Sequence, residues 1–208
     1  PVIRLCAALL LALILSGCDF ASNYLERTQF EVEGDRLLMT GLITSYTPGQ
    51  FERMVAAHPQ VDTVVLRGIE GSVDDAAMID MGYRLRALGL DTHLESYSQI
   101  YSGGAQLFLS GVERTMEQGA IIGVHSWRDN RRDGSVYPRG SPKHGLNRRY
   151  VEDMLGSDAF YWFTLRAAPS NGMHMLNEAE IAHYRLLTRP IYAPGAGGTQ
   201  QRRKKTCS

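Results

Sequence analysis

The feature that most constrains the fold is a regular succession of short apolar runs and helical patterns between residues 61 and 124. Residues 61–66 form a valine-rich apolar run, which is typical of a strand buried on both faces of a sheet. Residues 92–96 and 120–124 are two further strand candidates, and a helical pattern lies in each interval. Because the connections are short, this order predicts an α/β domain with a mostly parallel sheet and right-handed crossovers.

Capping signals mark the helix expected after the first of these strands. Residues 67–71 are expected to form a polar loop, with Ser72 as the N-cap and Gly89 just beyond the C-terminus. Met78 and Met81 recur at helical spacing. We interpret them as residues that fill the core rather than as a soft ligand-binding surface.

Other elements are indicated on both sides of this unit. Residues 30–44 predict a strand pair, and Thr47 with Gln50 predicts a capping box at the start of a helix. Three more helices are expected, over residues 150–155, over residues 159–165, and after a capping box of Asn177 with Glu180.

Ser102 is the candidate nucleophile. It precedes Gly103, Gly104 and an apolar run with helical spacing, which is typical of a hydroxyl at a tight loop-to-helix turn. His125 directly follows the strand at 120–124, so its imidazole is expected at a strand's carboxyl end, where functional residues of such sheets collect. The two residues are 125 − 102 = 23 positions apart, which one helix and one strand can fill. The alternatives are that Ser102 is a helix N-cap and that His125 is a buried histidine bonded to a carbonyl.

Charge and composition exclude some classes of function. The chain has 22 Lys and Arg against 22 Asp and Glu, so it lacks the basic excess of a general nucleic-acid binder. The six histidines are scattered singly and no Cys or His cluster has metal-ligand spacing, so neither a metal nor a cofactor is expected.

The amino terminus resembles a bacterial lipoprotein signal. Arg4 precedes an apolar run over residues 5–15, which is too short to span a bilayer but suits a signal-peptide core. The run closes on Leu-Ser-Gly-Cys, similar to a lipobox, which implies lipid attachment at Cys18. Asp19 resembles an inner-membrane retention mark. The expectation is a bacterial envelope protein, anchored by lipid on the periplasmic face of the inner membrane, with only Cys207 left as a free thiol.

The order of these elements resembles the Clp protease proteolytic subunit and crotonase superfamily, and is most similar to periplasmic Clp-like proteins. The resemblance spans about residues 37–187 and implies a single domain with a repeated ββα spiral and a mostly parallel sheet. It implies that Ser102 is the nucleophile, that His125 is the general base, and that the amides of Gly71 and Gly103 form the oxyanion hole.

Two positions depart from the family pattern. Glu70 stands where a glycine is usual, which would place a carboxylate beside the oxyanion hole. The family's orienting aspartate should fall near Met173, where no acid is found; Asn171 is the nearest acceptor, and Asp129 and Asp133 are alternatives.

The resemblance predicts a membrane-tethered serine hydrolase acting on peptide or acyl substrates. The alternatives are a catalytically inactive relative serving as an envelope binding or assembly module, and crotonase-type thioester chemistry. Residues 126–149 are rich in arginine and are a candidate lid, which could favour an anionic substrate or lipid headgroups. Aromatic residues 160–163 are expected in the core or at a homo-oligomer surface.

The expected organisation along the chain has four parts. They are a signal peptide at residues 1–17, a tether at 18–29, the α/β domain at 30–192 and a disordered basic tail at 193–208.

Overall fold

The computed structural model describes residues 27–129 and 132–195. The signal peptide, the lipidation candidate Cys18 and most of the basic tail lie outside the described residues. Among the helices that are described, none is both long and apolar enough to cross a membrane.

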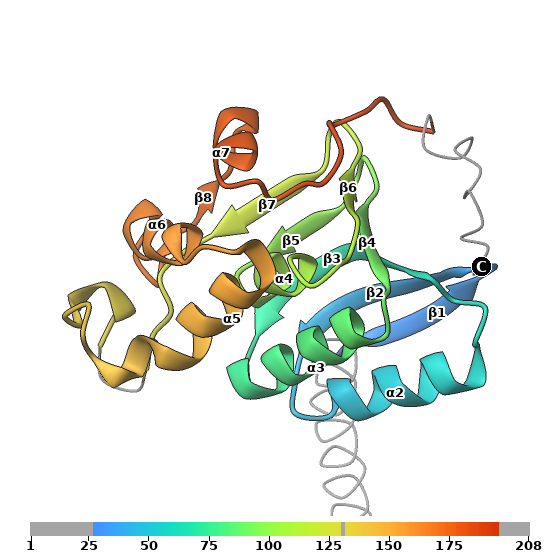
Figure 1. Cartoon of the computed structure of the whole chain (residues 1–208), viewed down its shortest axis with the longest axis horizontal. Coiled ribbons are helices and arrows are strands. Elements are labelled where there is room, and N and C mark those ends of the chain that lie inside the picture. The colour runs from blue at the N-terminus through green and yellow to red at the C-terminus, as the bar shows by residue number, and fades with distance from the viewer. Residues whose placement is uncertain (1–26, 130–131, 196–208) are drawn as a thin grey trace, which may run out of the picture.

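A sheet with mostly parallel strands forms the centre of the domain (Figure 1). The order along its main path is β1 (Gln29–Glu33), β2 (Arg36–Ile43), β3 (Thr63–Ser72), β5 (Gln99–Tyr101), β7 (Ile121–Val124) and β8 (His174–Met175). A branch runs from β3 through β4 (Asp91–Leu94) to β6 (Arg114–Met116). Only β1 with β2 and β7 with β8 pair antiparallel. The predicted fold class, a single α/β domain with a mostly parallel sheet, is therefore confirmed.

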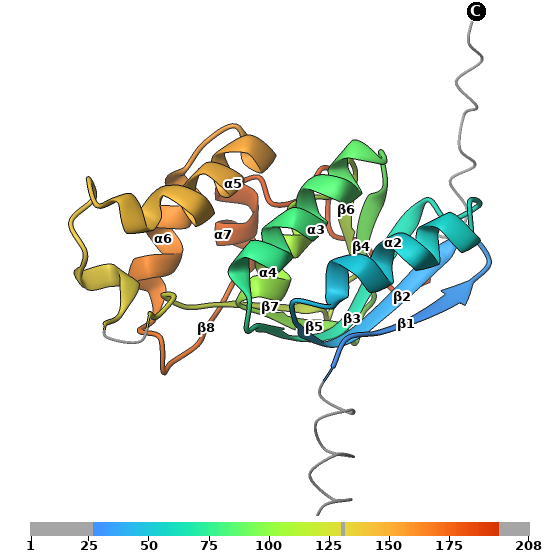
Figure 2. The same cartoon turned by 90° about the horizontal axis from the view of Figure 1, so that it is seen from below.

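Helices cover one face of the sheet. Figure 2 shows α2 (Thr47–Ala57), α3 (Asp75–Ala87) and α4 (Gly103–Phe108) on the same side of the strands. Their apolar residues pack on Leu37, Met39, Val64, Leu66 and Ile69 of β2 and β3 in one core. This packing accounts for the burial of alternate residues of β2 and β3, those on the face that the helices cover.

The remaining elements gather beyond the carboxyl ends of the strands. Residues 126–144 lead through two short 3₁₀ turns, Gly134–Val136 and Pro142–His144, into α5 (Gly145–Leu155). They are followed by α6 (Ala159–Ala167) and, after β8, by α7 (Glu178–His183). In Figure 1 the arrowheads of β3, β5 and β7 point toward α6 and this segment.

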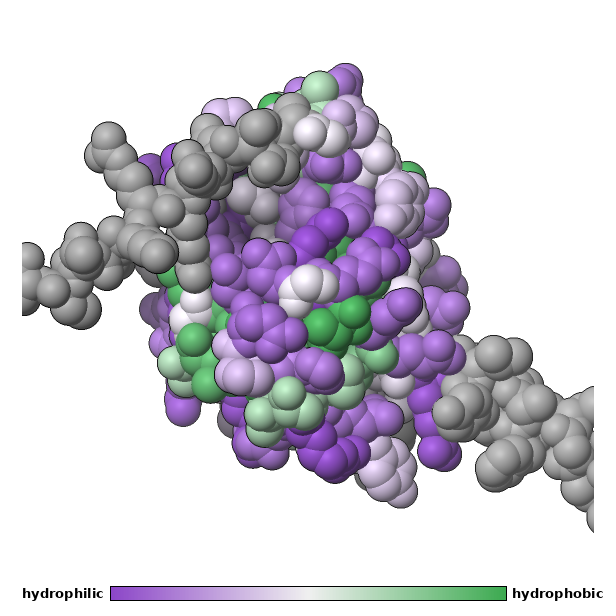
Figure 3. All heavy atoms as spheres, turned by 90° about the vertical axis from the view of Figure 1, so that its right-hand side faces the viewer, coloured by the Kyte–Doolittle hydropathy of each residue, from purple (hydrophilic) through white to green (hydrophobic). Residues whose placement is uncertain are grey.

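The opposite end of the molecule has a different surface. Figure 3 looks at the end from which those strands start, and most of the residues there are hydrophilic, around a limited hydrophobic area. The candidate site residues described below lie at the opposite end, where the central parallel strands have their carboxyl ends.

Several predicted boundaries are corrected by the structure. Residues 67–71 belong to β3 and do not form a loop, because pairing with β2 and β5 continues past Leu66 through a register irregularity. Asp74, not Ser72, caps α3, since its side chain accepts a hydrogen bond from the amide of Ala77. Thr47 lies inside α2, after Tyr46 at the N-cap, and its hydroxyl accepts from the amide of Thr44.

Other local predictions are confirmed. Gly89 has φ +71° just beyond α3, and the amides of Gly89 and Leu90 bond back to Arg86 and Leu85, as in a Schellman motif. Asn177 and Glu180 form the expected capping box of α7. Met78 and Met81 are fully buried in the core.

Candidate active site

Ser102 has an unusual backbone conformation at the junction of β5 and α4. Its φ is +51° and its ψ is −115°, a region that L-residues rarely adopt. Its amide donates to the carbonyl of Gly123 on β7 at 2.9 Å, which fixes the turn to the neighbouring strand. Ser102 occupies the N-cap position of α4, but its side chain makes no capping hydrogen bond. The hydroxyl is therefore free for another role.

The glycines around Ser102 permit a close approach of α4 to β3. A Cβ atom on Gly103 would lie 2.5 Å from the Cβ of Ser72, and one on Gly104 would lie 2.6 Å from a methyl carbon of Ile69. Any larger residue at either position would push the helix away from the strand. The two glycines therefore hold Ser102 against the carboxyl end of β3.

Gly71 lies next to the Ser102 side chain. It has φ +142°, and a Cβ on Gly71 would point at the Ser102 side chain, 3.4 Å from its Cβ and 3.9 Å from its Oγ. Gly103 follows Ser102 as the first residue of α4, where the amide has no partner inside the helix. Both residues proposed for the oxyanion hole thus flank the serine.

Glu70 is an exposed residue of β3, between Ile69 and Gly71. Ile69 approaches α4 at Gly104, and Gly71 lies beside Ser102. The pairing of β3 with β2 is irregular between Gly68 and Gly71. Glu70 is not among the residues that line the pocket at Ser102.

His125 follows β7, and its ring is held by its own chain. Its Nδ1 lies 2.8 Å from the carbonyl oxygen of Ser126. Since a carbonyl only accepts, this contact requires the proton on Nδ1 and leaves Nε2 with a free lone pair. No hydrogen bond to Nε2 is found among the residues that the structure describes. His125 is half-buried and has the tautomer that a general base needs.

The three candidate orienting residues lie elsewhere. Asn171 is exposed in the connection from α6 to β8, and within the described ranges no hydrogen bond joins it to His125. Asp129 binds Lys143 and the hydroxyl of Tyr137. Asp133 accepts from the amides of Ser135 and Ser170. Burial alone would raise the pKa of Asp133, but hydrogen bonds from Ser126, Ser135 and Ser170 outweigh it and hold the pKa far below its ordinary value. Asp133 thus anchors the loop after β7, and a role for Asn171 in orienting His125 stays a prediction.

A small pocket brings Ser102 and His125 together. Its free volume is about 20 Å³, enough for a group the size of one water molecule. The walls come from α3, α4, β7, the loop after β7 and α6. The lining residues are Asp75, Ser102, Gly103, Ala105, Gln106, Val124, His125, Trp127, Phe160 and Thr164.

Four of these wall residues carry no recognisable signal in the sequence as parts of a site. In the sequence, Asp75 is typical of a carboxylate in the first turn of a helix, and Gln106 is typical of an ordinary helical position. Trp127 donates from its indole to the hydroxyl of Tyr161 at 2.8 Å, and Phe160 is buried in the core. Only the packing of α3 beside α4, and of α6 against the loop after β7, brings these residues into the wall of the pocket.

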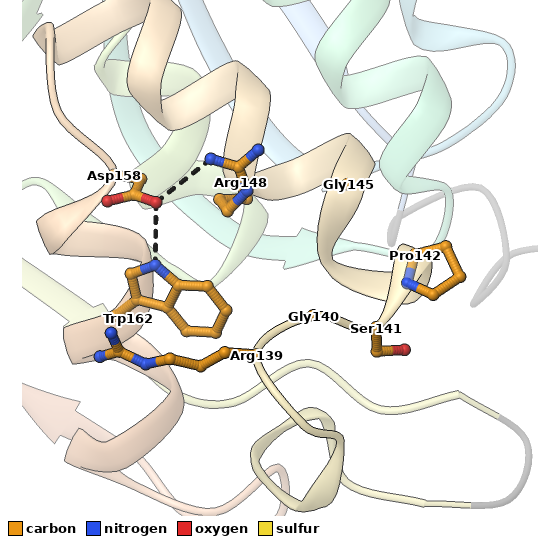
Figure 4. Close-up of a pocket in the computed structure, with 8 residues that line it drawn as sticks. All are labelled: Arg139, Gly140, Ser141, Pro142, Gly145, Arg148, Asp158 and Trp162. Carbon is orange, nitrogen blue, oxygen red and sulfur yellow. Dashed lines mark hydrogen bonds and ion pairs between the residues drawn. The ribbon is translucent and has the colours of Figure 1, made fainter.

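The arginine-rich segment builds a second, larger hollow of about 500 Å³ on the surface between its loop and α5 and α6 (Figure 4). The guanidinium of Arg139 lies 4.7 Å from the centre of the Trp162 ring. Asp158 accepts from both the Trp162 indole and Arg148. This hollow contains no nucleophile and base pair, and its charges are largely paired, so the catalytic candidates belong to the small pocket.

No group of three or more His, Cys, Asp or Glu that could hold a metal ion is found among residues 27–129 and 132–195.

Of the comparisons with known proteins, the one with solved structures gives matches. No family model matches the chain, and no curated protein matches it. Two solved structures of the membrane-bound stomatin-specific protease 1510-N are similar to it, each with 17% sequence identity. One is a lysine-to-alanine variant with a substrate peptide, with a TM-score of 0.54 over 77% of this chain and 74% of that one. The other is a serine-to-alanine variant, with a TM-score of 0.52 over 77% and 79%.

This likeness shows the fold. The chain is a single α/β domain with a mixed, mostly parallel sheet, and it has the Clp-protease-like fold of the stomatin-specific protease.

Proposed function

We propose that this protein is a membrane-tethered serine hydrolase of the cell envelope that cleaves peptide or acyl substrates. The observation that carries the proposal is the backbone of Ser102, which is held at φ +51° beside Gly71 and in one pocket with His125. Strained backbone of this kind is concentrated at functional sites, because it persists only where the surrounding structure enforces it.

In this mechanism His125 Nε2 takes the proton from Ser102 Oγ as the oxygen attacks the substrate carbonyl carbon. The amides of Gly71 and Gly103 donate to the developing oxyanion. Collapse of the intermediate expels the leaving group, which receives the proton from His125, and water then hydrolyses the acyl-enzyme by the same steps in reverse. The Ser126 carbonyl holds the imidazole in the required tautomer, and Asn171 is proposed to assist it.

Peptides are the preferred substrate class. The similar fold belongs to a protease, and one of its structures contains a substrate peptide. That protease is also membrane-bound, which agrees with the lipid anchor expected at Cys18, inserted at the periplasmic face of the inner membrane.

Lys143 is the alternative base. The serine and the lysine replaced in the two similar structures are 41 positions apart, and 143 − 102 is also 41 in this chain. However, the Lys143 ammonium binds the Asp129 carboxylate, and this hydrogen bond raises the pKa of Lys143 above its ordinary value. A lysine held protonated is a poor base at neutral pH, so His125 is the better candidate.

Fluorophosphonate labelling of the full chain in detergent, read by intact mass, tests the proposal. We expect one adduct on the native chain, none on Ser102→Ala, and a rate at least about 100-fold lower for His125→Ala. Ser170→Ala, a serine outside the pocket, and Glu70→Gln, an exposed residue that does not line it, should both label at the native rate.

The other outcomes are also informative. Loss of labelling in Lys143→Ala with retention in His125→Ala would transfer the role of base to Lys143. No adduct on a folded native chain would reject the hydrolase and favour the second function, an inactive envelope binding or assembly module.

A further inference from the structure

The pocket at Ser102 has an excess of hydrogen-bond acceptors. Asp75, the first residue of α3, contributes a half-buried carboxylate to its wall. No ion pair to Asp75 is found in the described part of the chain. Its Oδ2 accepts from the Asn147 amide at 2.9 Å, and its Oδ1 has no partner there. A cation bound beside this carboxylate would form a charge-assisted hydrogen bond with it.

Two further oxygens, one in the same wall and one beside Asp75, have no donor among the described residues. Gln106 lines the pocket, and its Oε1 is buried without a hydrogen bond. Asn147 contacts Asp75 but does not line the pocket; it is 7% exposed, and its Oδ1 is likewise buried without a partner while its Nδ2 is engaged with Asp75. Buried polar atoms are rarely left unpaired in native proteins. The wall therefore offers two acceptors, Asp75 Oδ1 and Gln106 Oε1, to a ligand that donates several hydrogen bonds.

The remaining walls suit a cation on an alkyl chain. Trp127 and Phe160 provide aromatic surface, which packs against methylene groups and attracts a cation through the ring faces. The free volume of about 20 Å³ fits an ammonium group, which is about the size of one water molecule.

We propose that the Ser102 pocket binds a primary ammonium group of the substrate, from a lysine side chain or from a free amino terminus, and that Asp75 selects it. The assignment to a substrate rests on the proposed function, whereas the binding of the ammonium group does not. The Asp75 carboxylate would form an ion pair with the ammonium group, and Gln106 Oε1 would accept a further hydrogen bond from the same group.

Binding is tested without turnover on the full chain carrying Ser102→Ala, in detergent, by ligand-observed NMR titration. Three probes separate the two sources of the ammonium group. Nα-acetyl-lysine methylamide has only the side-chain ammonium, alanine methylamide has only the α-amino group, and Nα-acetyl-norleucine methylamide has neither. We expect one of the two cationic probes to bind at least about tenfold more tightly than the norleucine probe. That probe identifies the source.

The variants localise the effect. Asp75→Asn should reduce the preference at least about fivefold, whereas Asp80→Asn, which removes the same charge from an exposed position of α3, should keep it. Gln106→Met, which leaves the Asp75 to Asn147 bond intact, should also weaken the preference, and it serves if Asp75→Asn unfolds. Equal binding of all three probes, or a preference that survives both Asp75→Asn and Gln106→Met, would overturn the inference.

The result is separable from the fluorophosphonate test. A preference for the cationic probe on a protein that takes no label keeps the ammonium site and rejects the hydrolase. Labelling of Ser102 with no such preference keeps the hydrolase and rejects the ammonium site.

Discussion

Ser102 holds a backbone conformation that costs an L-residue about 1–3 kcal/mol. Glycine has no Cβ and adopts positive φ without this cost, although it loses more entropy on folding than alanine does. We predict that Ser102→Gly is more stable than Ser102→Ala by about 1 kcal/mol, measured by urea unfolding. Both variants lack the hydroxyl, so the comparison isolates the backbone. Equal stabilities would mean that the turn is not strained and would remove the main support for a reactive serine.

Individual site residues could be predicted from the sequence only where a polar side chain stands next to a recognisable local pattern. Ser102 and His125 are marked by the Gly-Gly turn and by the end of an apolar run, and the structure brings both into one pocket. The partner of the His125 ring could not be predicted, because it is the backbone carbonyl of Ser126, which any residue type would supply. Asp75 could not be assigned to the pocket either, since only the packing of α3 beside α4 brings it there.

At the scale of elements, Glu95 joins three parallel strands. It follows β4 and accepts from Arg36 of β2 and Arg67 of β3, each at 2.7 Å. Burial alone would raise the pKa of Glu95, but the hydrogen bonds from Arg67, Tyr97 and Arg36 outweigh it and lower the pKa from its ordinary 4.5 to about 2. A depressed pKa in the folded state means that the carboxylate contributes stability above its ordinary pKa and loses it as the pH falls toward 2.

We predict that acid removes this contribution from the native chain and not from Glu95→Gln. Between pH 6 and pH 2.5, the free energy of unfolding of the native chain should fall by about 2 kcal/mol more than that of the variant, measured by urea unfolding. Glu113→Gln, which removes an exposed carboxylate paired with Arg189, should follow the native pH dependence. Parallel curves for the native chain and Glu95→Gln would contradict the prediction.

Elements with strong periodicity were predictable, and those defined by long-range pairing were not. The apolar runs of β3 and β7 and the helical stripe of α3 are visible in their own residues. The extension of β3 through Gly68 and Gly71 depends on β2 and β5, which override the weak strand tendency of glycine. The strand β6 has three residues, too few for a period, and it forms because β4 is available as a partner.

At the scale of the whole molecule, Arg114 joins the sheet to the segment that follows α7. Its guanidinium is buried and donates to the carbonyls of Leu186, Gly111 and Arg185. Its backbone exchanges hydrogen bonds with Thr188, and farther along Tyr192 forms an isolated bridge with Glu117. Burial, with a contribution from nearby Arg86, lowers the pKa of Arg114. Burial of the guanidinium charge is therefore unfavourable, and its N–H groups are needed as donors to the backbone carbonyls around it.

Replacing Arg114 should release this closing segment from the rest of the fold. In Arg114→Met the carbonyls of Leu186 and Arg185 lose this donor, while the carbonyl of Gly111 keeps Arg86. Unpaired buried acceptors cost more than the modest net value of the hydrogen bonds themselves. We predict a loss of about 2–3 kcal/mol in the free energy of unfolding, with faster amide hydrogen exchange at Thr188 and unchanged exchange in β7 under native conditions. Arg189→Met, which breaks an exposed ion pair with Glu113 in the same segment, should cost no more than about 0.5 kcal/mol. Similar losses in the two variants would mean that the segment is held by its backbone alone, because the buried guanidinium would then add nothing beyond the Thr188 pairing.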